Sequence, residues 1–131
     1  MNALLSIKPK YVEKIIDGTK KYEFRKAIFK HDVKNIWIYE SAPTKKIIGM
    51  FSVGKILQDT PESLWEMLQD KSGISEKEFF CYFEGKGIGY ALEIKKFTLF
   101  KEKIDPQDAI SDFHAPQSFC YWNDVPIPLP Q

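Results

Sequence analysis

The feature that most constrains this chain is the order of its strand and helix signals. Apolar runs and period-two alternation predict strands over 3–7, 21–26, 33–40, 47–57 and 90–100, with one further strand late in the chain. Helical spacing predicts three helices, one between Pro9 and Gly18, one after Thr60 and one after Ser75. Three strands in succession without a helix indicate an α+β fold with a mixed or antiparallel sheet of about five to six strands. Gly49 and Gly54 are expected to bend the third of these strands, so that the sheet curls into a small barrel.

The helix starts carry specific signals. Thr60 precedes Pro61 and is expected to be an N-cap, since proline suits the first helical position. Ser75 and Glu78 have the spacing of a capping box. Both signals place helix starts within one residue.

Length and composition are typical of one folded domain over residues 1–131. The chain is 44% hydrophobic and 15% aromatic, which supplies enough apolar side chains for a core. Its formal charge is only +1, so attraction to nucleic acid must come from a local patch.

The two cysteines, Cys81 and Cys120, are expected to be free and buried, and neither forms a CxxC pair. His31 and His114 lack metal-ligand spacing, so the sequence predicts no metal and no cofactor. No segment is long and apolar enough for a membrane span or a signal peptide, and we therefore expect a cytoplasmic protein.

The stretch 16–26 concentrates charge just after a predicted helix. Gly18, Lys20, Glu23 and Arg25 follow a GxKxxExR pattern, with Lys21 between them. Glu23 and Arg25 are two residues apart on a strand, so they project from one face, and Lys20 in the preceding turn can reach over it. This arrangement fits a salt-bridged strand edge and a polar ligand site equally well.

The aromatic run 79–83 is also open to two interpretations. Phe79, Phe80 and Phe83 share one helical stripe and are expected to pack in the core. Tyr82 lies to the side of that stripe and is kept as a candidate ligand contact. Cys81 has no nearby histidine that would activate a thiolate.

These patterns together resemble the ASCH domain family of the PUA-like superfamily, in particular its small bacterial members. The GxKxxExR element is the family's mark, and the resemblance runs from Leu4 to about Phe100. It also rests on the start of the chain, on the S-x-P loop and on the PQSF tail, namely Ser6, Ile7, Pro9, Ser41, Pro43 and residues 116–119.

The resemblance implies a small PUA-like β-barrel with flanking helices and a cleft beside the motif. It implies RNA or nucleotide binding, and some members are described as regulators of transcription. One branch hydrolyses N4-acetylcytidine with a lysine, a threonine and a glutamate, and another is ribonucleolytic. Lys20 matches the lysine, but Glu23 stands where that branch has its threonine. The distant glutamate has several candidates, namely Glu62, Glu66, Asp70 and Glu84.

Three hypotheses follow. In the first, the domain binds RNA or a nucleotide and regulates transcription or translation. Gly18 makes the turn that starts the motif. The expected ligand contacts are Lys20, Lys21, Glu23, Arg25, Tyr39, Ser41 and Tyr82. In the second, it is an amidohydrolase or ribonuclease in which Lys20 serves as a base or nucleophile and Glu23 exchanges protons with Lys20. In the third, its proline-rich tail recruits a protein partner. The oligomeric state stays open.

Overall fold

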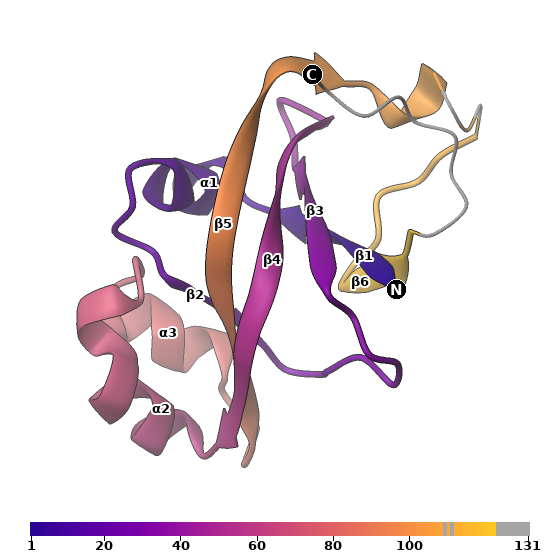
Figure 1. Cartoon of the computed structure of the whole chain (residues 1–131). Coiled ribbons are helices and arrows are strands. Elements are labelled where there is room, and N and C mark those ends of the chain that lie inside the picture. The colour runs from indigo at the N-terminus through magenta and orange to yellow at the C-terminus, as the bar shows by residue number, and fades with distance from the viewer. Residues whose placement is uncertain (109, 111, 123–131) are drawn as a thin grey trace.

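A single curled sheet organises the molecule. The computed structural model describes residues 1–108, 110 and 112–122 (Figure 1). Its strands are β1 (Asn2–Ile7), β2 (Tyr22–Arg25), β3 (Asn35–Glu40), β4 (Lys46–Asp59), β5 (Gly89–Ile104) and β6 (Phe119–Tyr121). They lie in the order β2-β5-β4-β3-β1-β6, with β1 parallel to β3 and every other pair antiparallel. The predicted α+β class with a mixed sheet and a late extra strand is confirmed.

The three predicted helices are α1 (Pro9–Ile16), α2 (Pro61–Leu68) and α3 (Glu76–Tyr82). Two short 3₁₀ helices, Gln69–Lys71 and Pro106–Asp108, complete the described elements. Thr60 caps α2 by accepting from the Ser63 N–H, and Ser75 caps α3 by accepting from the Glu78 N–H, as predicted. The α2–α3 pair lies beside one end of the long strands, and α1 covers the sheet near the end of β1 (Figure 1).

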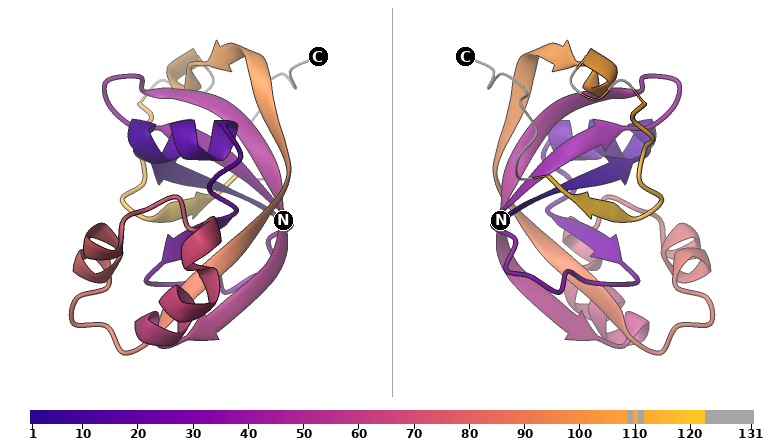
Figure 2. Two further views of the ribbon diagram at one scale, coloured as in Figure 1. Left: turned by 90° about the vertical axis from the view of Figure 1, so that its left-hand side faces the viewer. Right: turned by 90° about the vertical axis from the view of Figure 1, so that its right-hand side faces the viewer.

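The curl of the sheet comes from β4 and β5, which are 14 and 16 residues long. Their pairing contains three register shifts, and such irregularities bend a strand pair. At Gly49 a Cβ atom would lie 2.4 Å from the carbonyl oxygen of Thr98, so only glycine fits this close approach. Figure 2 shows both strands bowing around the molecule. The sheet closes only part of the way and forms a half-barrel.

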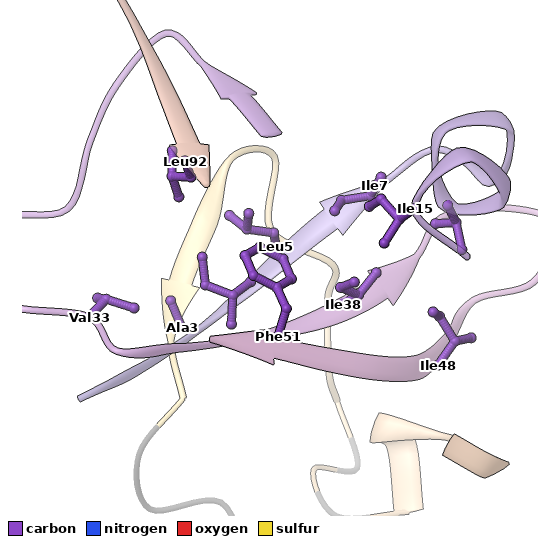
Figure 3. Packing of buried hydrophobic residues seen from close by; sticks show 11 residues of the cluster. Ala3, Leu5, Ile7, Ile15, Val33, Ile38, Ile48, Phe51 and Leu92 are labelled. Atoms are coloured by element: carbon purple, nitrogen blue, oxygen red, sulfur yellow. The ribbon is translucent and has the colours of Figure 1, made fainter. Parts of the chain in front are cut away.

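The main core lies inside this curl, between the sheet and α1 (Figure 3). Phe51 and Leu5 are fully buried there, and Ile15 brings α1 onto the same cluster. A second cluster joins the tail to the other side of the sheet, where Phe113 and Trp122 pack with Tyr39. A third cluster fixes α2 and α3 against the strands around Phe79. Burial of these side chains supplies the main driving force for folding.

Several details differ from the sequence expectation. Cys81 and Cys120 are free, but Cys81 is exposed and Cys120 is half-buried, so the expectation of burial was wrong. The reason is that Cys81 lies on the face of α3 that points away from the Phe79 cluster.

The predicted extended course of the proline-rich tail falls partly on residues 123–131, which lie outside the described residues. None of the described helices is long and apolar enough to cross a membrane.

Candidate functional site

The charged stretch after α1 is held in place by its backbone. Gly18 adopts a positive φ of 86°, which favours glycine and ends the helix. The backbone N–H of Lys20 then donates a hydrogen bond to the carbonyl oxygen of Lys14. The backbone N–H of Lys21 donates to the carbonyl oxygen of Lys71. The turn therefore delivers Lys20 inward and starts β2 in a defined register against β5.

A pocket of about 510 Å³ opens beside this stretch. It contains three residues of the GxKxxExR motif, together with parts of β1, α1 and α3. Its lining residues are Ser6, Ile7, Lys8, Tyr11, Lys20, Glu23, Phe24, Arg25, Ile74, Glu78, Cys81, Tyr82 and Gln117. A volume of this size is within the range of small-molecule sites.

Lys20 is the most unusual residue in the pocket, because its side chain is only 3% exposed. Its Nζ donates to the carbonyl oxygen of Ser72 at 2.9 Å and lies 3.9 Å from a carboxylate oxygen of Glu23. The Phe24 ring centroid is 4.9 Å from the same nitrogen. Burial lowers the pKa of Lys20 below its ordinary value, and the Glu23 carboxylate opposes this shift. A lysine in this state holds its proton weakly.

Gly73 is what allows Lys20 to be buried here. A Cβ on Gly73 would lie 2.5 Å from the Cβ of Lys20, and Gly73 itself has a φ of 62°. Ser72 is also buried, and its hydroxyl donates to the carbonyl oxygens of Gln69 and Ile74. The turn at Ser72 and Gly73 thus packs closely against one side of the Lys20 side chain.

Glu23 and Arg25 form the second half of the charge cluster. Nη1 of Arg25 lies 3.3 Å from Oε2 of Glu23, and both side chains are about nine-tenths buried. Nη2 of Arg25 donates to the carbonyl oxygen of Ser118 at 2.8 Å and to its hydroxyl at 3.0 Å. Because Ser118 directly precedes β6, Arg25 links the two edges of the half-barrel. Nε of Arg25 is buried with no hydrogen-bond partner among the described residues.

Two tyrosines complete the walls. The hydroxyl of Tyr11 donates to Glu78, which Lys10 also contacts, so α1 is tied to α3. The hydrogen bonds from Lys10 and Tyr11 lower the pKa of Glu78 to about 2. The pKa of Tyr11 is raised by its burial and by its hydrogen bond to Glu78. Tyr82 is half-buried in the pocket, and Nζ of Lys26 lies 4.6 Å from its ring centroid.

The structure thus brings together four of the predicted site residues, namely Lys20, Glu23, Arg25 and Tyr82. Gly18 shapes the turn before them. Tyr39 is elsewhere, buried against Phe113 in the second cluster, and Ser41 and Lys21 do not line the pocket. Alternation alone does not say which side of a curled sheet a strand residue faces, so the sequence could not place Tyr39 relative to this pocket.

Sequence reasoning missed Glu78 and Gln117, which line the pocket. It also missed the distant residues that contact Lys20 and Arg25, namely Ser72, Gly73 and Ser118. The capping box identified Glu78 as a helix residue only, and the PQSF tail contained Ser118 without showing its contact with Arg25. Among residues 1–108, 110 and 112–122, no cluster of three or more histidine, cysteine, aspartate or glutamate side chains could hold a metal ion.

The burial of Lys20 predicts a specific dependence of stability on pH. Between the lowered pKa of folded Lys20 and its ordinary value of 10.5, the unfolded chain binds a proton that the folded chain does not. The free energy of unfolding therefore gains a contribution that rises with pH through this window. In Lys20→Met this contribution is lost, so wild type should gain stability relative to the variant as pH rises.

Urea unfolding of both proteins from pH 6 to pH 10 measures this difference. Lys103→Met, at an exposed position of β5, should run parallel to wild type. A constant gap between wild type and Lys20→Met across the pH range would show that Lys20 titrates as an ordinary lysine.

Comparison with known proteins identifies the family. The ASCH domain profile matches residues 5–104, which is most of the chain. The chain belongs to the ASCH domain family. An ASCH domain-containing ribonuclease of Zymomonas mobilis is 33% identical over 122 residues, covering 91% of this chain and 82% of that protein. This agreement confirms the family resemblance seen in the sequence.

Solved ASCH structures confirm the fold. The crystal structure of ASCH from Zymomonas mobilis superposes with a TM-score of 0.86 and 27% identity, covering 94% of this chain and 88% of that one. A tyrosine-to-phenylalanine variant of the same protein superposes equally well, at 26% identity over 94% and 91% of the two chains. The curled sheet with its three helices is therefore the ASCH architecture.

A different kind of relative shares the domain but is longer. A Ureaplasma parvum protein named large ribosomal subunit protein uL22 is 30% identical over 122 residues. The match covers 90% of this chain, but the chain spans only 38% of that protein's length. This chain therefore spans less than half of the length of that relative.

Proposed function

We propose that this ASCH domain binds single-stranded RNA, or a nucleotide, in the pocket beside β2. The observation that carries the proposal is the buried cluster of Lys20, Glu23 and Arg25 in the lining of one cavity. Arg25 would bind a phosphate through its guanidinium, for which charge-assisted hydrogen bonds are the natural interaction. Its Nε is buried without a hydrogen-bond partner among the described residues, and a phosphate bound to the guanidinium would supply one.

The rest of the pocket fits a nucleotide. Lys8 adds a positive charge to the rim, and Tyr82 offers a ring face on which a base can stack. Ser6 and Gln117 supply polar side chains for base or sugar edges. Regulation of transcription or translation would follow from such binding. A cytoplasmic location is part of the proposal, because the two free cysteines fit a reducing compartment.

The binding proposal is tested with Arg25→Gln. A 2′-O-methylated oligouridylate labelled with fluorescein serves as the probe, since it resists cleavage at its phosphates. Loss of one phosphate contact should weaken binding roughly tenfold and lower the slope of log K against log salt by about one. Fluorescence anisotropy at several salt concentrations gives both values.

Lys103→Gln is the matched control, because it removes an exposed positive charge of β5 that does not line the pocket. It should bind the probe as wild type does. Equal affinity of Arg25→Gln and wild type, with both proteins folded by circular dichroism, would refute the proposed site.

A second function, cleavage of the bound RNA, is favoured by two observations. One is the similarity to the Zymomonas ribonuclease over 82% of that protein, and the other is the lowered pKa of Lys20. We infer that Lys20, in the fraction of molecules where it has lost its own proton, accepts the proton of a ribose 2′-hydroxyl. The 2′-oxygen then forms a bond to phosphorus, and the bond from phosphorus to the 5′-oxygen breaks. The leaving oxygen takes a proton from water, and the resulting hydroxide takes the proton from Lys20, which restores the base. The products are a 2′,3′-cyclic phosphate and a 5′-hydroxyl.

Hydrolysis of an acylated cytidine is less well supported. The family branch that performs it has a threonine where this chain has Glu23, and Glu23 is engaged by both Lys20 and Arg25. The RNA phosphodiester is therefore the substrate class that we propose.

A further inference from the structure

We propose that a second hollow, between α1 and the 69–75 segment, binds the nucleoside next to the phosphate that Arg25 binds beside Lys20. This proposal rests on the proposed function and extends it from one nucleotide to a strand of at least two. The hollow has a volume of about 440 Å³. Its lining residues are Lys10, Tyr11, Lys14, Thr19, Gln69, Asp70, Ser72, Gly73, Ile74, Ser75 and Glu78.

The two cavities adjoin. Tyr11, Ile74 and Glu78 line both of them, so the hydrogen-bonded side chains of Tyr11 and Glu78 lie at the boundary between the two cavities. Lys20 packs beside this boundary. Its side chain lines the first cavity, while the two residues that it packs against, Ser72 and Gly73, line the second. A ligand part that reaches Lys20 is therefore within one nucleoside length of the second hollow.

The charges of the two cavities differ, and this difference assigns their occupants. The first is lined by three cationic side chains, of Lys8, Lys20 and Arg25, and by two carboxylates, of Glu23 and Glu78. Its net positive charge and the unpartnered guanidinium nitrogen suit a phosphate.

The second cavity has two lysines, Lys10 and Lys14, and two carboxylates, Asp70 and Glu78. Its lining is electrically balanced, so a phosphate gains little there. A neutral base with polar edges is the part of an RNA strand that fits such a lining.

The walls of the second cavity match a base. Tyr11 and Ile74 give it apolar surface, against which a base face can pack. The exposed Gln69 offers an amide that both donates and accepts, which is the pairing that base edges require. The hydroxyls of Thr19 and Ser75 extend the polar rim.

The test compares two probes that differ by one nucleoside. These are the methyl ester of 2′-O-methyluridine 3′-monophosphate and the fully 2′-O-methylated dinucleotide UpU, so that both phosphates are diesters of equal charge. Wild type should bind the dinucleotide about tenfold more tightly, as expected for one additional stacked base. Isothermal titration calorimetry gives both affinities.

Gln69→Trp fills the second cavity without touching Lys20 or Arg25. It should remove the advantage of the dinucleotide and leave binding of the methyl ester unchanged. Met67→Trp is the matched control, because Met67 is exposed near the end of α2, two residues before Gln69, and lines neither cavity. It should bind both probes as wild type does.

Two outcomes overturn the inference separately from the proposed function. Equal affinity of wild type for the two probes would exclude a second subsite while leaving the phosphate site in place. An equal loss for both probes in Gln69→Trp would show that the substitution acts on the first cavity instead. Failure of wild type to bind either probe would reject the proposed function and the second subsite together.

Discussion

Replacement of Lys20 with methionine is expected to lower the rate of RNA cleavage by about 10²- to 10⁴-fold, the usual contribution of a positioned general base. Methionine is similar in length and apolar, so it suits a site that is 3% exposed and flanked by Phe24. The substitution therefore removes the proton acceptor with little change in packing. Single-turnover cleavage of an oligouridylate measures the rate.

The pH profile separates a chemical role for Lys20 from a structural one. In wild type the rate should rise with pH as Lys20 loses its proton, through a pKa that burial has lowered. This limb should be absent from the residual activity of Lys20→Met. Lys20→Arg should stay equally slow, because a guanidinium keeps its proton at any accessible pH. Lys103→Met should cleave at the wild-type rate, and full activity in Lys20→Met would reject the mechanism.

Replacement of Glu23 with alanine is expected to lower the free energy of unfolding by about 3–5 kcal/mol, the cost of breaking a buried ion pair from one side. Glu23 contacts both Lys20 and Arg25, and its side chain is 9% exposed. Without it, two cationic groups share a buried pocket with no counter-charge between them. Urea denaturation near neutral pH measures the loss.

A double-mutant cycle identifies the cause of this loss. In Lys20→Met/Glu23→Ala one of the two stranded charges is gone, so the double variant should be less destabilised than the sum of the two single variants. Glu102→Ala, at an exposed position of β5, should change stability by less than about 0.5 kcal/mol. Additive effects would mean that Glu23 stabilises the fold independently of Lys20.

Local patterns in the chain were sufficient to predict most of its elements. The caps at Thr60 and Ser75 are local, since each joins residues three apart, and both were found where expected. The strands were found for the same reason, because alternation is a property of neighbouring residues. β5 runs four residues beyond its predicted end, since its last part is held by pairing with β4, where Ile104 lies opposite Ile47, and not by an alternating pattern of its own.

The candidate site was predictable only in part. Lys20, Glu23 and Arg25 lie within six residues, and their pattern resembled a known family. Tyr82 was separated from its aromatic neighbours by helical geometry. The contact of Arg25 with Ser118 spans 93 positions, and that of Lys20 with Ser72 spans 52, so no local signal contained them.

The sequence by itself determined the kinds of element, their order and the charged motif, because these depend on residues that are close along the chain. Only the tertiary structure decided that the motif faces inward. The curl of β4 and β5 brings β2 near the start of β6, and the 72–73 turn covers Lys20 from the side. Burial then changes the chemistry of the motif, because a lysine removed from water holds its proton less firmly than the same lysine on a strand edge.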